Sequence, residues 1–324
     1  MIRSAALAWV SAAWLAGGGP AAAEDGAVPR VTPVVEGTAH QALFAVAFDA
    51  ERGVAVGAAG ELLLTGDRGV SWHPSKQNGA TGLSLLGVDV RGAHAVAVGQ
   101  AGLILVSDGN DAWQKAATAA QERLFAVIMN DAGKAVAVGA FGTIILSADF
   151  GRTWRSIAPP DVAQFSDQGA EPHLYAASVG PSGMVTVTGE FGLILRTLDD
   201  GGHWSVVHKG EASLFALDLP GAAEGFAVGQ SGTILRTGDG GVTWREEPSN
   251  TTANLLGVTA APDGKAIVTA MNSVLVSDDH GSSWRSVAWG DFGSTWYAGA
   301  QFVESAPATA ILVGHAGRVL RMSL

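Results

Sequence analysis

The sequence predicts an all-β fold, a seven-bladed β-propeller of four-stranded antiparallel blades. Tryptophans recur along the 324 residues at spacings of 41, 41, 50, 40 and 40, and an apolar hairpin-like segment precedes most of them. The tryptophans of this series are Trp72, Trp113, Trp154, Trp204, Trp244 and Trp284. A repeat of this length is typical of solenoids and propellers. The 44 glycines and 15% charged residues suit short strands joined by tight turns rather than helices.

Each repeat begins with an apolar strand that often carries an aromatic residue. A small residue follows the aromatic, which suits the crowded innermost strand of a blade. These segments are residues 43–46, 85–88, 124–127, 174–177, 214–217, 255–258 and 296–299. Seven such segments predict seven blades, because four strands per unit at this period describe a propeller blade.

The second part of the repeat is a hairpin with a glycine-containing turn. Aliphatic and β-branched residues flank two or three turn residues, which is a hairpin signal. The segments are residues 54–64 (VAVGAAGELLL), 96–106 (VAVGQAGLILV), 136–146 (VAVGAFGTIIL), 187–196 (VTGEFGLILR) and 226–236 (FAVGQSGTILR).

A turn of the form Ser/Thr-x-Asp-x-Gly-x-x-Trp follows the hairpin. The complete pattern contains Asp67, Asp149, Asp199, Asp239 and Asp279. The second unit keeps Asp108 and Trp113, whereas Val106 and Asn110 replace the hydroxyl residue and the glycine. The carboxylate can accept N–H bonds within its own turn, glycine supplies a positive φ, and tryptophan buries a large ring. We therefore assign these aspartates and tryptophans a structural role.

The seventh unit lacks an Asp turn, since the sequence stops at Leu324 where the next tryptophan is due. One step of 41 residues before Trp72 lies Val31. We expect residues 31–36 to supply the outer strand of the last blade, because ring closure removes exposed strand edges. The propeller then spans residues 31–324.

The N-terminus has the composition of a secretory signal peptide. Arg3 precedes an apolar run at residues 5–16, and small alanines precede Glu24. The run is shorter than the roughly 20 residues that cross a bilayer. We expect residues 1–23 to be cleaved, residues 24–30 to form a short linker, and the product to be periplasmic or secreted, without insertion into the membrane.

Composition excludes several classes of function. The formal net charge of −11 argues against binding nucleic acid or an anionic membrane surface. The absence of cysteine excludes disulfides and thiolate metal sites. The eight histidines show no metal-ligand spacing, and residues 108–111 hold too few ligands for a calcium loop. We expect no cofactor and no metal.

The combined V-G-x-x-G and S/T-x-D-x-G-x-x-W pattern is that of BNR, or Asp-box, repeats and resembles the Ycf48/Hcf136 family over residues 31–324. The resemblance implies a non-enzymatic propeller that binds proteins and helps to assemble or stabilise a membrane protein complex. In phototrophic members that complex is photosystem II, whose D1-containing intermediates are bound. Cyanobacterial members are typically lipoproteins, and this chain has no cysteine to acylate. We expect a monomer.

An Asp-box glycosidase or sialidase is the alternative. A glycosidase needs two carboxylates about 5–10 Å apart, and a sialidase needs a tyrosine nucleophile with an acid partner and several arginines. We place Tyr175 and Tyr297 at the same inner-strand aromatic position as Phe44, where packing explains them, and we predict no enzyme. Carboxylates converging in the channel beside arginines would favour the enzyme. A periplasmic accessory of a membrane transporter is a further alternative.

Binding residues are expected on the face that carries the hairpin turns and the blade-to-blade connections, because variable loops concentrate function. The insertion at residues 161–171 should project over this face, either as a binding element or as a tolerated insertion. The candidates are Gln100, Phe141, Phe165, Glu190, Phe191, Gln230, Trp289, Phe292 and His315. Trp289 and Phe292 are the best hot-spot candidates, since aromatic anchors carry interface energy.

Overall fold

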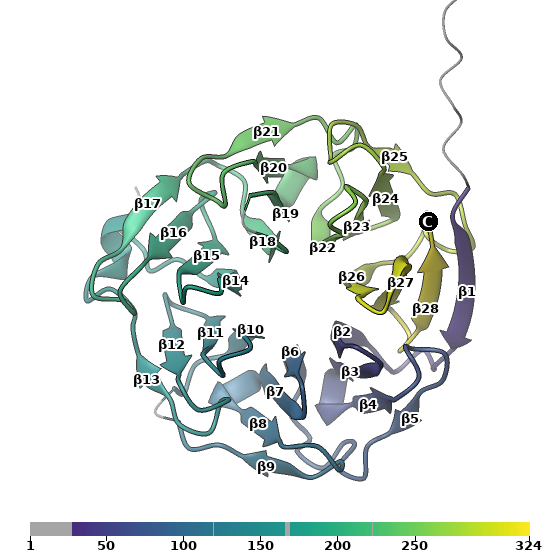
Figure 1. Ribbon diagram of the computed structural model, residues 1–324, viewed down its shortest axis with the longest axis horizontal. Helices are drawn as coiled ribbons and strands as arrows, with labels where there is room; N and C mark the ends of the chain where they lie inside the picture. Colours follow the sequence, from purple (N-terminus) through teal and green to yellow (C-terminus); the bar gives the residue numbers. More distant parts are fainter. Residues whose placement is uncertain (1–27, 119, 166–168, 222) are drawn as a thin grey trace, which may run out of the picture.

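The structure is a computed structural model that describes residues 28–118, 120–165, 169–221 and 223–324. The predicted signal peptide and residues 24–27 of the predicted linker lie outside the described residues. The described part forms seven four-stranded antiparallel sheets arranged radially around a central channel (Figure 1). The predicted seven-bladed β-propeller is confirmed.

Blades 1 to 6 each use four consecutive strands, from the channel outward. Blade 1 comprises β2 (Leu43–Asp49), β3 (Arg52–Gly57), β4 (Leu62–Thr65) and β5 (His73–Pro74). Blade 2 comprises β6 (Leu85–Arg91), β7 (His94–Gly99), β8 (Ile104–Ser107) and β9 (Trp113–Lys115). Blade 3 comprises β10 (Leu124–Met129), β11 (Ala135–Gly139), β12 (Ile144–Ser147) and β13 (Arg155–Ser156).

The next three blades repeat this order. Blade 4 comprises β14 (Leu174–Val179), β15 (Val185–Gly189), β16 (Ile194–Thr197) and β17 (Ser205–His208). Blade 5 comprises β18 (Leu214–Asp218), β19 (Gly225–Gly229), β20 (Ile234–Thr237) and β21 (Arg245–Glu247). Blade 6 comprises β22 (Leu255–Ala260), β23 (Ala266–Ala270), β24 (Ser273–Ser277) and β25 (Arg285–Ser286). Short 3₁₀ turns are η1 (Ala58–Gly60), η2 (Gln100–Gly102), η3 (Val162–Phe165) and η4 (Gln230–Gly232).

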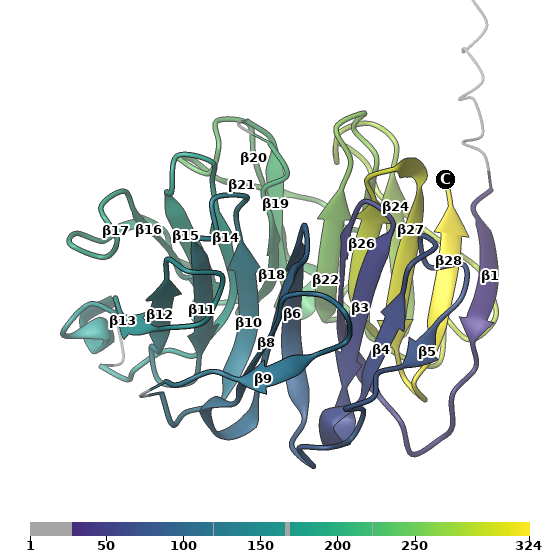
Figure 2. The same cartoon turned by 60° about the horizontal axis from the view of Figure 1, so that its bottom comes forward.

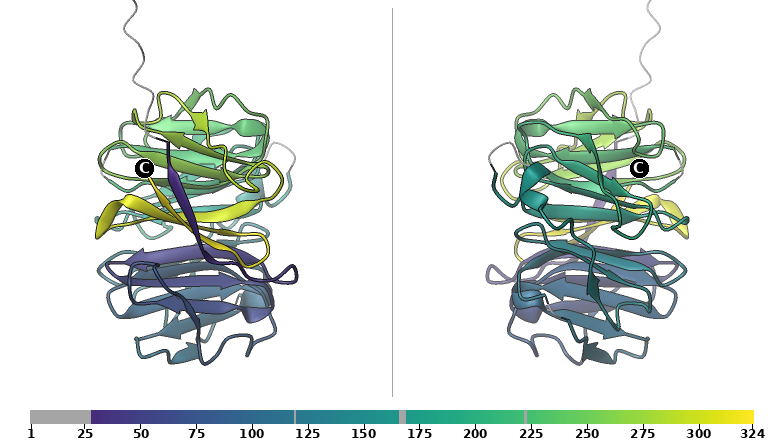
Figure 3. Two further views of the ribbon diagram at one scale, coloured as in Figure 1. Left: turned by 90° about the vertical axis from the view of Figure 1, so that its right-hand side faces the viewer. Right: turned by 90° about the vertical axis from the view of Figure 1, so that its left-hand side faces the viewer.

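Blade 7 is built from both ends of the chain. It comprises β26 (Tyr297–Val303), β27 (Ala306–Gly314), β28 (Val319–Ser323) and, outermost, β1 (Arg30–Val35). β1 runs antiparallel to β28, with Arg30 opposite Ser323, and Figure 3 shows it beside that strand. Pro33 is tolerated here because an outermost strand has one unpaired edge. The predicted closure by the N-terminal strand is confirmed.

The strands run between two faces (Figure 2). The hairpin-turn face carries the turns between second and third strands together with the blade connections; for example, the Ala140 N–H donates to the Arg123 carbonyl. The Asp-box face carries the other turns; for example, the Phe150 N–H donates to the Gly133 carbonyl. None of the helical segments among the described residues is long and apolar enough to cross a membrane.

The V-G-x-x-G motif forms the hairpin turns of the hairpin-turn face, and its two glycines have different structural roles. A Cβ on Gly229 would lie 1.9 Å from the carbonyl oxygen of Ser213, so the first glycine allows close backbone approach. Gly232 has a φ of +79°, so the second glycine supplies the left-handed turn. The hydrophobic core lies between neighbouring blades; Val56 and Leu85, for instance, are fully buried in one cluster shared by blades 1 and 2.

Five Asp-box turns have the same internal pattern of hydrogen bonds. In blade 3, Asp149 Oδ1 accepts from the Ser147 hydroxyl at 2.7 Å and from the Thr153 N–H at 2.9 Å. Asp149 Oδ2 accepts from the Thr153 hydroxyl at 2.7 Å. The equivalent aspartates, with the same Oδ1 interactions to their own turns, are Asp67, Asp199, Asp239 and Asp279. Asp199 differs at Oδ2, which contacts the ring nitrogen of His203 instead of a hydroxyl. Each carboxylate is thus engaged by its own turn.

The second unit differs from the sequence prediction. Strand register places Ser107, rather than Val106, at the hydroxyl position, opposite Ala95. The turn to Trp113 is therefore one residue shorter, and Gly109 stands where other blades have the aspartate. Asp108 instead contacts His94 Nδ1 at 2.9 Å and Arg152 at 2.8 Å. Assigning Asp108 as an Asp-box carboxylate was wrong, because alignment on the acid concealed the shortened turn.

Candidate functional site

The second residue of each inner strand forms a partly exposed collar around the channel at the hairpin-turn face. The first residues, such as Leu43 and Leu174, are buried and pair with the end of the second strand. A register shift follows each of them. The inner strands are the innermost strand of each blade (Figure 1), so the partly exposed residues one position later lie around the inner rim of the hairpin-turn face. The collar is Phe44, Leu86, Phe125, Tyr175, Phe215, Leu256 and Ala298.

Tyr297 does not belong to this collar. It pairs with Gly314, as Leu43 pairs with Gly57, and it is 1% exposed. Placing both tyrosines at one position was wrong, because the aromatic of the last blade is shifted by one residue. Ala298 takes the collar position there.

Aromatic rings from three adjacent blades meet at this inner rim. The ring centroids of Phe125 and Tyr175 are 5.4 Å apart, and those of Tyr175 and Phe215 are 5.3 Å apart. The ring of His173 lies 4.9 Å from that of Phe141 and 6.4 Å from that of Tyr175. We call these five residues the aromatic cluster. Such edge and tilted contacts are the favoured geometry of aromatic pairs.

Glu190 forms hydrogen bonds with two members of this cluster. Its Oε2 accepts from the His173 backbone N–H at 2.8 Å, and its Oε1 accepts from the Tyr175 hydroxyl at 3.3 Å. Burial, together with the charge and hydrogen bond of Glu190, raises the pKa of Tyr175 to about 12. His173 Nδ1 lies 3.1 Å from the Phe141 N–H and accepts from it, so this nitrogen carries no proton.

The other predicted residues occupy the same face in different settings. Gln100 and Gln230 stand at the position of Glu190 in blades 2 and 5, and their side-chain oxygens accept from Ser84 and Ser213 N–H groups at 2.9 and 3.4 Å. His315 lies at the equivalent turn of blade 7, with its ring centroid 6.1 Å from that of Trp296.

Phe165 and Phe191 are not in ring contact with the aromatic cluster among the described residues. Phe165 packs against a core cluster shared by blades 3 and 4, and Phe191 lies at the left-handed position of its turn, with a φ of 58°. The described part of the predicted insertion covers the turn of blade 3, since a Cβ on Gly142 would lie 2.3 Å from Val162. Residues 166–168 of the insertion lie outside the described residues.

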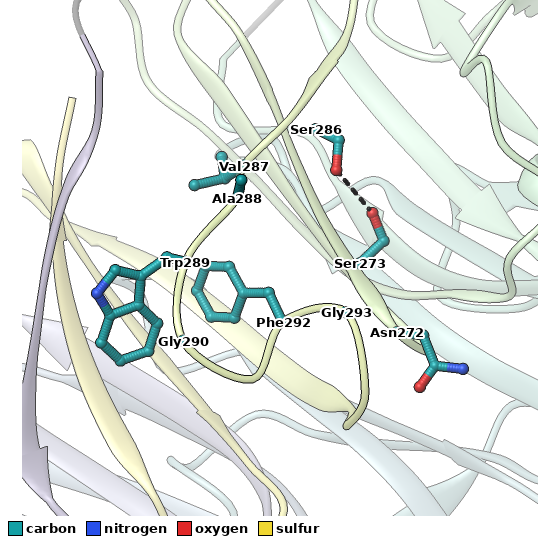
Figure 4. A pocket seen from close by; sticks show the side chains of 9 residues that line it. All are labelled: Asn272, Ser273, Ser286, Val287, Ala288, Trp289, Gly290, Phe292 and Gly293. Carbon is teal, nitrogen blue, oxygen red and sulfur yellow. Dashed lines mark hydrogen bonds between the residues drawn. The ribbon is translucent and has the colours of Figure 1, made fainter.

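Phe292 is 2% exposed and packs edge-on against Tyr297. Proposing it as a hot spot was wrong, because the connection folds its ring into the core rather than onto the surface. Half-buried Trp289 packs on the ring of Phe292 and borders an open pocket of about 500 Å³ (Figure 4). Ser273 and Ser286, whose hydroxyl oxygens lie 3.4 Å apart, supply polar lining on its far side.

Two carboxylates lie further along inner strands, Asp89 on β6 and Asp218 on β18. Asp89 Oδ2 accepts from the Met129 N–H at 2.6 Å, and Asp218 Oδ2 accepts from the Ala260 N–H at 2.8 Å. Each bond joins an inner strand to that of the next blade and satisfies an edge N–H. Burial raises the pKa of both carboxyls to about 6, although the charge of Arg91 acts on both in the opposite direction.

The described residues contain no group of three or more side chains suited to hold a metal ion. In the segment that faintly resembles a calcium loop, the acids are taken up by protein groups. Asp111 accepts from the Ser75 hydroxyl and the Lys76 N–H, and Asp108 contacts His94 and Arg152.

Several solved structures have a similar architecture. YCF48 bound to D1 peptide superposes with a TM-score of 0.71 at 16% sequence identity, covering 93% of this chain and 98% of that chain. YCF48 from Cyanidioschyzon merolae also gives 0.71, at 18% identity, with 90% and 98% covered. The fold resembles that of YCF48. The GH74 xyloglucanase from Xanthomonas campestris gives 0.68 at 13% identity, with 90% of this chain and 53% of the xyloglucanase covered.

Sequence comparison adds little to this likeness. No family model matches the chain. The uncharacterized protein YkuO of Bacillus subtilis is 37% identical over 60 residues, which is 18% of this chain and 20% of YkuO. The match thus spans a fifth of that relative. At such identities the similarity establishes the fold, and function has to be inferred from the site.

Proposed function

We propose that the chain is an exported, non-enzymatic propeller that binds a protein through its hairpin-turn face. We propose further that it is a Ycf48-like assembly or stability factor for a membrane protein complex. The aromatic cluster at the inner rim of the hairpin-turn face carries this proposal. Aromatic side chains are enriched at interface hot spots, and Phe141 keeps 54% of its surface exposed. The D1 peptide bound by YCF48, whose fold is similar, supports a peptide segment as ligand.

Phe141 occupies a position where an aromatic residue is unfavourable. Its φ is 52°, in the left-handed region, which costs a non-glycine residue about 1–2 kcal/mol. Ala59, Ala101, Ser231 and Ala316 fill the equivalent position in four other blades at similar φ, and Phe191 does so in blade 4. The turn therefore does not need a phenylalanine, and an exposed ring at a strained position points to binding.

Affinity capture with crosslinking from membranes of the organism tests this function. The matched variants are Phe141→Asn and Val242→Asn. Val242 is also 54% exposed but lies in an Asp-box turn on the opposite face. We expect the wild type and Val242→Asn to recover the same membrane-complex subunit, and Phe141→Asn to recover several-fold less. Equal recovery by both variants, or no recovery by the wild type, would contradict the proposal.

The identity of the captured subunit decides the finer assignment. A photosystem II precursor would support a role in photosynthesis, whereas a transporter subunit would identify a periplasmic accessory. Export is tested separately, by mass spectrometry of the N-terminus of periplasmic and secreted material. We expect it to begin at Glu24; recovery of the uncleaved chain from the cytoplasm alone would contradict export.

A glycosidase is the second candidate, favoured by the action of Arg91 on both Asp89 and Asp218 and by the fold likeness to the GH74 xyloglucanase. Against it, Asp89 is 2% exposed and both acids bind backbone N–H groups. A sialidase-like use of Tyr175 is opposed by its raised pKa, since a nucleophile needs a more easily ionised phenol. Hydrolysis of a glycan by the wild type but not by Asp218→Asn would establish the enzyme.

A further inference from the structure

We propose that the aromatic cluster and Glu190 form a seat for a cationic side chain, a lysine or an arginine of the docking protein segment. This inference rests on the proposed function, since it names the chemistry that the hairpin-turn face recognises. The seat combines aromatic rings from three blades with one carboxylate that is hydrogen-bonded to the Tyr175 hydroxyl.

The hairpin turn does not require a charged side chain at the position of Glu190. Gln100 and Gln230 hold the equivalent place in blades 2 and 5, and each neutral side chain accepts the same backbone N–H bond. Glu190 does so with a full negative charge. A half-buried charge at a site where an amide suffices indicates a ligand of opposite sign.

Among the residues that the structure describes, no lysine or arginine forms an ion pair with Glu190. The carboxylate takes part in hydrogen bonds to His173 and Tyr175. Arg123, which precedes the strand that carries Phe125, is exposed and forms no ion pair with Glu190. Each carboxylate oxygen has a second lone pair, so Glu190 can accept from an incoming cation while it keeps both existing bonds.

The surrounding rings suit the same ligand. A lysine or arginine over an aromatic face is attracted by the ring quadrupole, most strongly when the contact is desolvated. Because Nδ1 of His173 accepts the Phe141 N–H, this ring nitrogen presents no N–H to an incoming cation. The overall charge of −11 adds a long-range attraction for a basic segment.

Model peptides test the seat directly. The probes are N-acetylated, C-amidated heptapeptides of glycine and alanine with a central arginine, lysine, citrulline or leucine, titrated at pH 7 and low salt. Binding is followed by NMR shifts of the aromatic cluster in the full-length protein. Citrulline is nearly isosteric with arginine but neutral, so it isolates the charge. We expect millimolar binding of the arginine and lysine peptides and about tenfold weaker binding of citrulline and leucine.

Glu190→Gln reproduces the residue of blades 2 and 5 and is therefore expected to fold; an unchanged melting temperature checks this. We expect it to weaken arginine binding about tenfold. Gln100→Glu places the same charge beside Leu86 rather than an aromatic ring, and we expect it to leave arginine binding at the cluster unchanged.

Equal affinity for arginine and citrulline, unchanged binding by Glu190→Gln, or absence of shifts at 20 mM or so of the arginine peptide would each overturn the seat. The experiments distinguish failure of the protein-binding function from failure of the cation seat. Membrane capture that depends on Phe141 but not on Glu190 would keep the protein-binding function and remove the cation seat. Arginine binding without any captured partner would do the reverse.

Discussion

The two faces of the propeller use repeated positions in opposite ways. On the Asp-box face the same residue types recur, and each carboxylate is bound by its own turn, as Asp149 is by Ser147 and Thr153. On the hairpin-turn face one position holds Gln100, Glu190, Gln230 or His315 on the same turn. A repeated turn restricts the residue type at a position only where the side chain of that residue stabilises the turn. Where backbone hydrogen bonds alone close the turn, the residue type can vary between blades and can serve binding.

The largest expected effect tests whether the backbone makes the hairpin turn. Gly229→Ala would drive a Cβ into the Ser213 carbonyl, so we expect a loss of about 3 kcal/mol in the free energy of unfolding. Chemical denaturation measures it. Gly238→Ala is the control, because a Cβ there meets no atom within 4 Å. Equal stability of the two variants would contradict the prediction, because it would show that the hairpin backbone shifts to accommodate the added Cβ.

The next effect compares two aspartates of neighbouring blades. Asp149→Ala removes the acceptor of its turn, and we expect a loss of about 1–2 kcal/mol. Asp108 makes only exposed ion pairs, so Asp108→Ala should lose less than about 1 kcal/mol. Thermal unfolding of both variants measures the difference. If the second loss matched the first, Asp108 would hold its turn after all.

A third effect contrasts carboxylates of the Asp-box face with those of the inner strands. Hydrogen bonds to Thr243 lower the pKa of Asp239 to about 2, whereas burial raises that of Asp218 to about 6. A pKa raised on folding stabilises the protein below the unfolded value and loses that contribution as pH rises through 6.

Asp218→Asn removes this pH-dependent contribution to stability and keeps a side-chain oxygen that can accept from the Ala260 N–H. From pH 4 to pH 7 we therefore expect the variant to gain about 1–2 kcal/mol over the wild type. Urea unfolding at the two pH values measures this change. A constant difference between variant and wild type would mean that Asp218 titrates as it does in the unfolded chain.

The smallest effect concerns stability on the hairpin-turn face. Glu190→Gln should change the free energy of unfolding by less than about 0.5 kcal/mol, because Gln230 shows that an amide satisfies the same turn. Circular dichroism melts check this. A loss comparable with that of Asp149→Ala would make Glu190 a structural residue and erase the contrast between the faces.

The sequence was sufficient for the architecture because the repeat is local. The spacing of tryptophans, the glycine hairpins and the displaced outer strand at Val31 all follow from periodicity, and the closure of blade 7 confirms them. Register within a unit was harder to predict. Tyr297 and Ser107 are each one residue from the place that motif alignment indicated, since only strand pairing shows which residue faces which.

The site was predicted in part. Phe141 and Glu190 were found from equivalent turn positions, but their contacts with His173 and Tyr175 depend on how adjacent blades meet. The sequence did contain a pattern that could have predicted the aromatic cluster, since Phe125, Tyr175 and Phe215 occupy one position in three consecutive repeats. Burial of Phe292 could not be predicted, because the connection of residues 287–296 has no repeat equivalent.

The pairing of β1 with β28 has a kinetic consequence. These strands lie at opposite ends of the described chain, with Arg30 facing Ser323, so their contact has the greatest loop-closure entropy and should be the slowest to form. Until then the chain is an open arc whose free strand edges can pair with another copy. The interval between synthesis and ring closure is therefore the period in which this molecule is most exposed to aggregation or domain exchange.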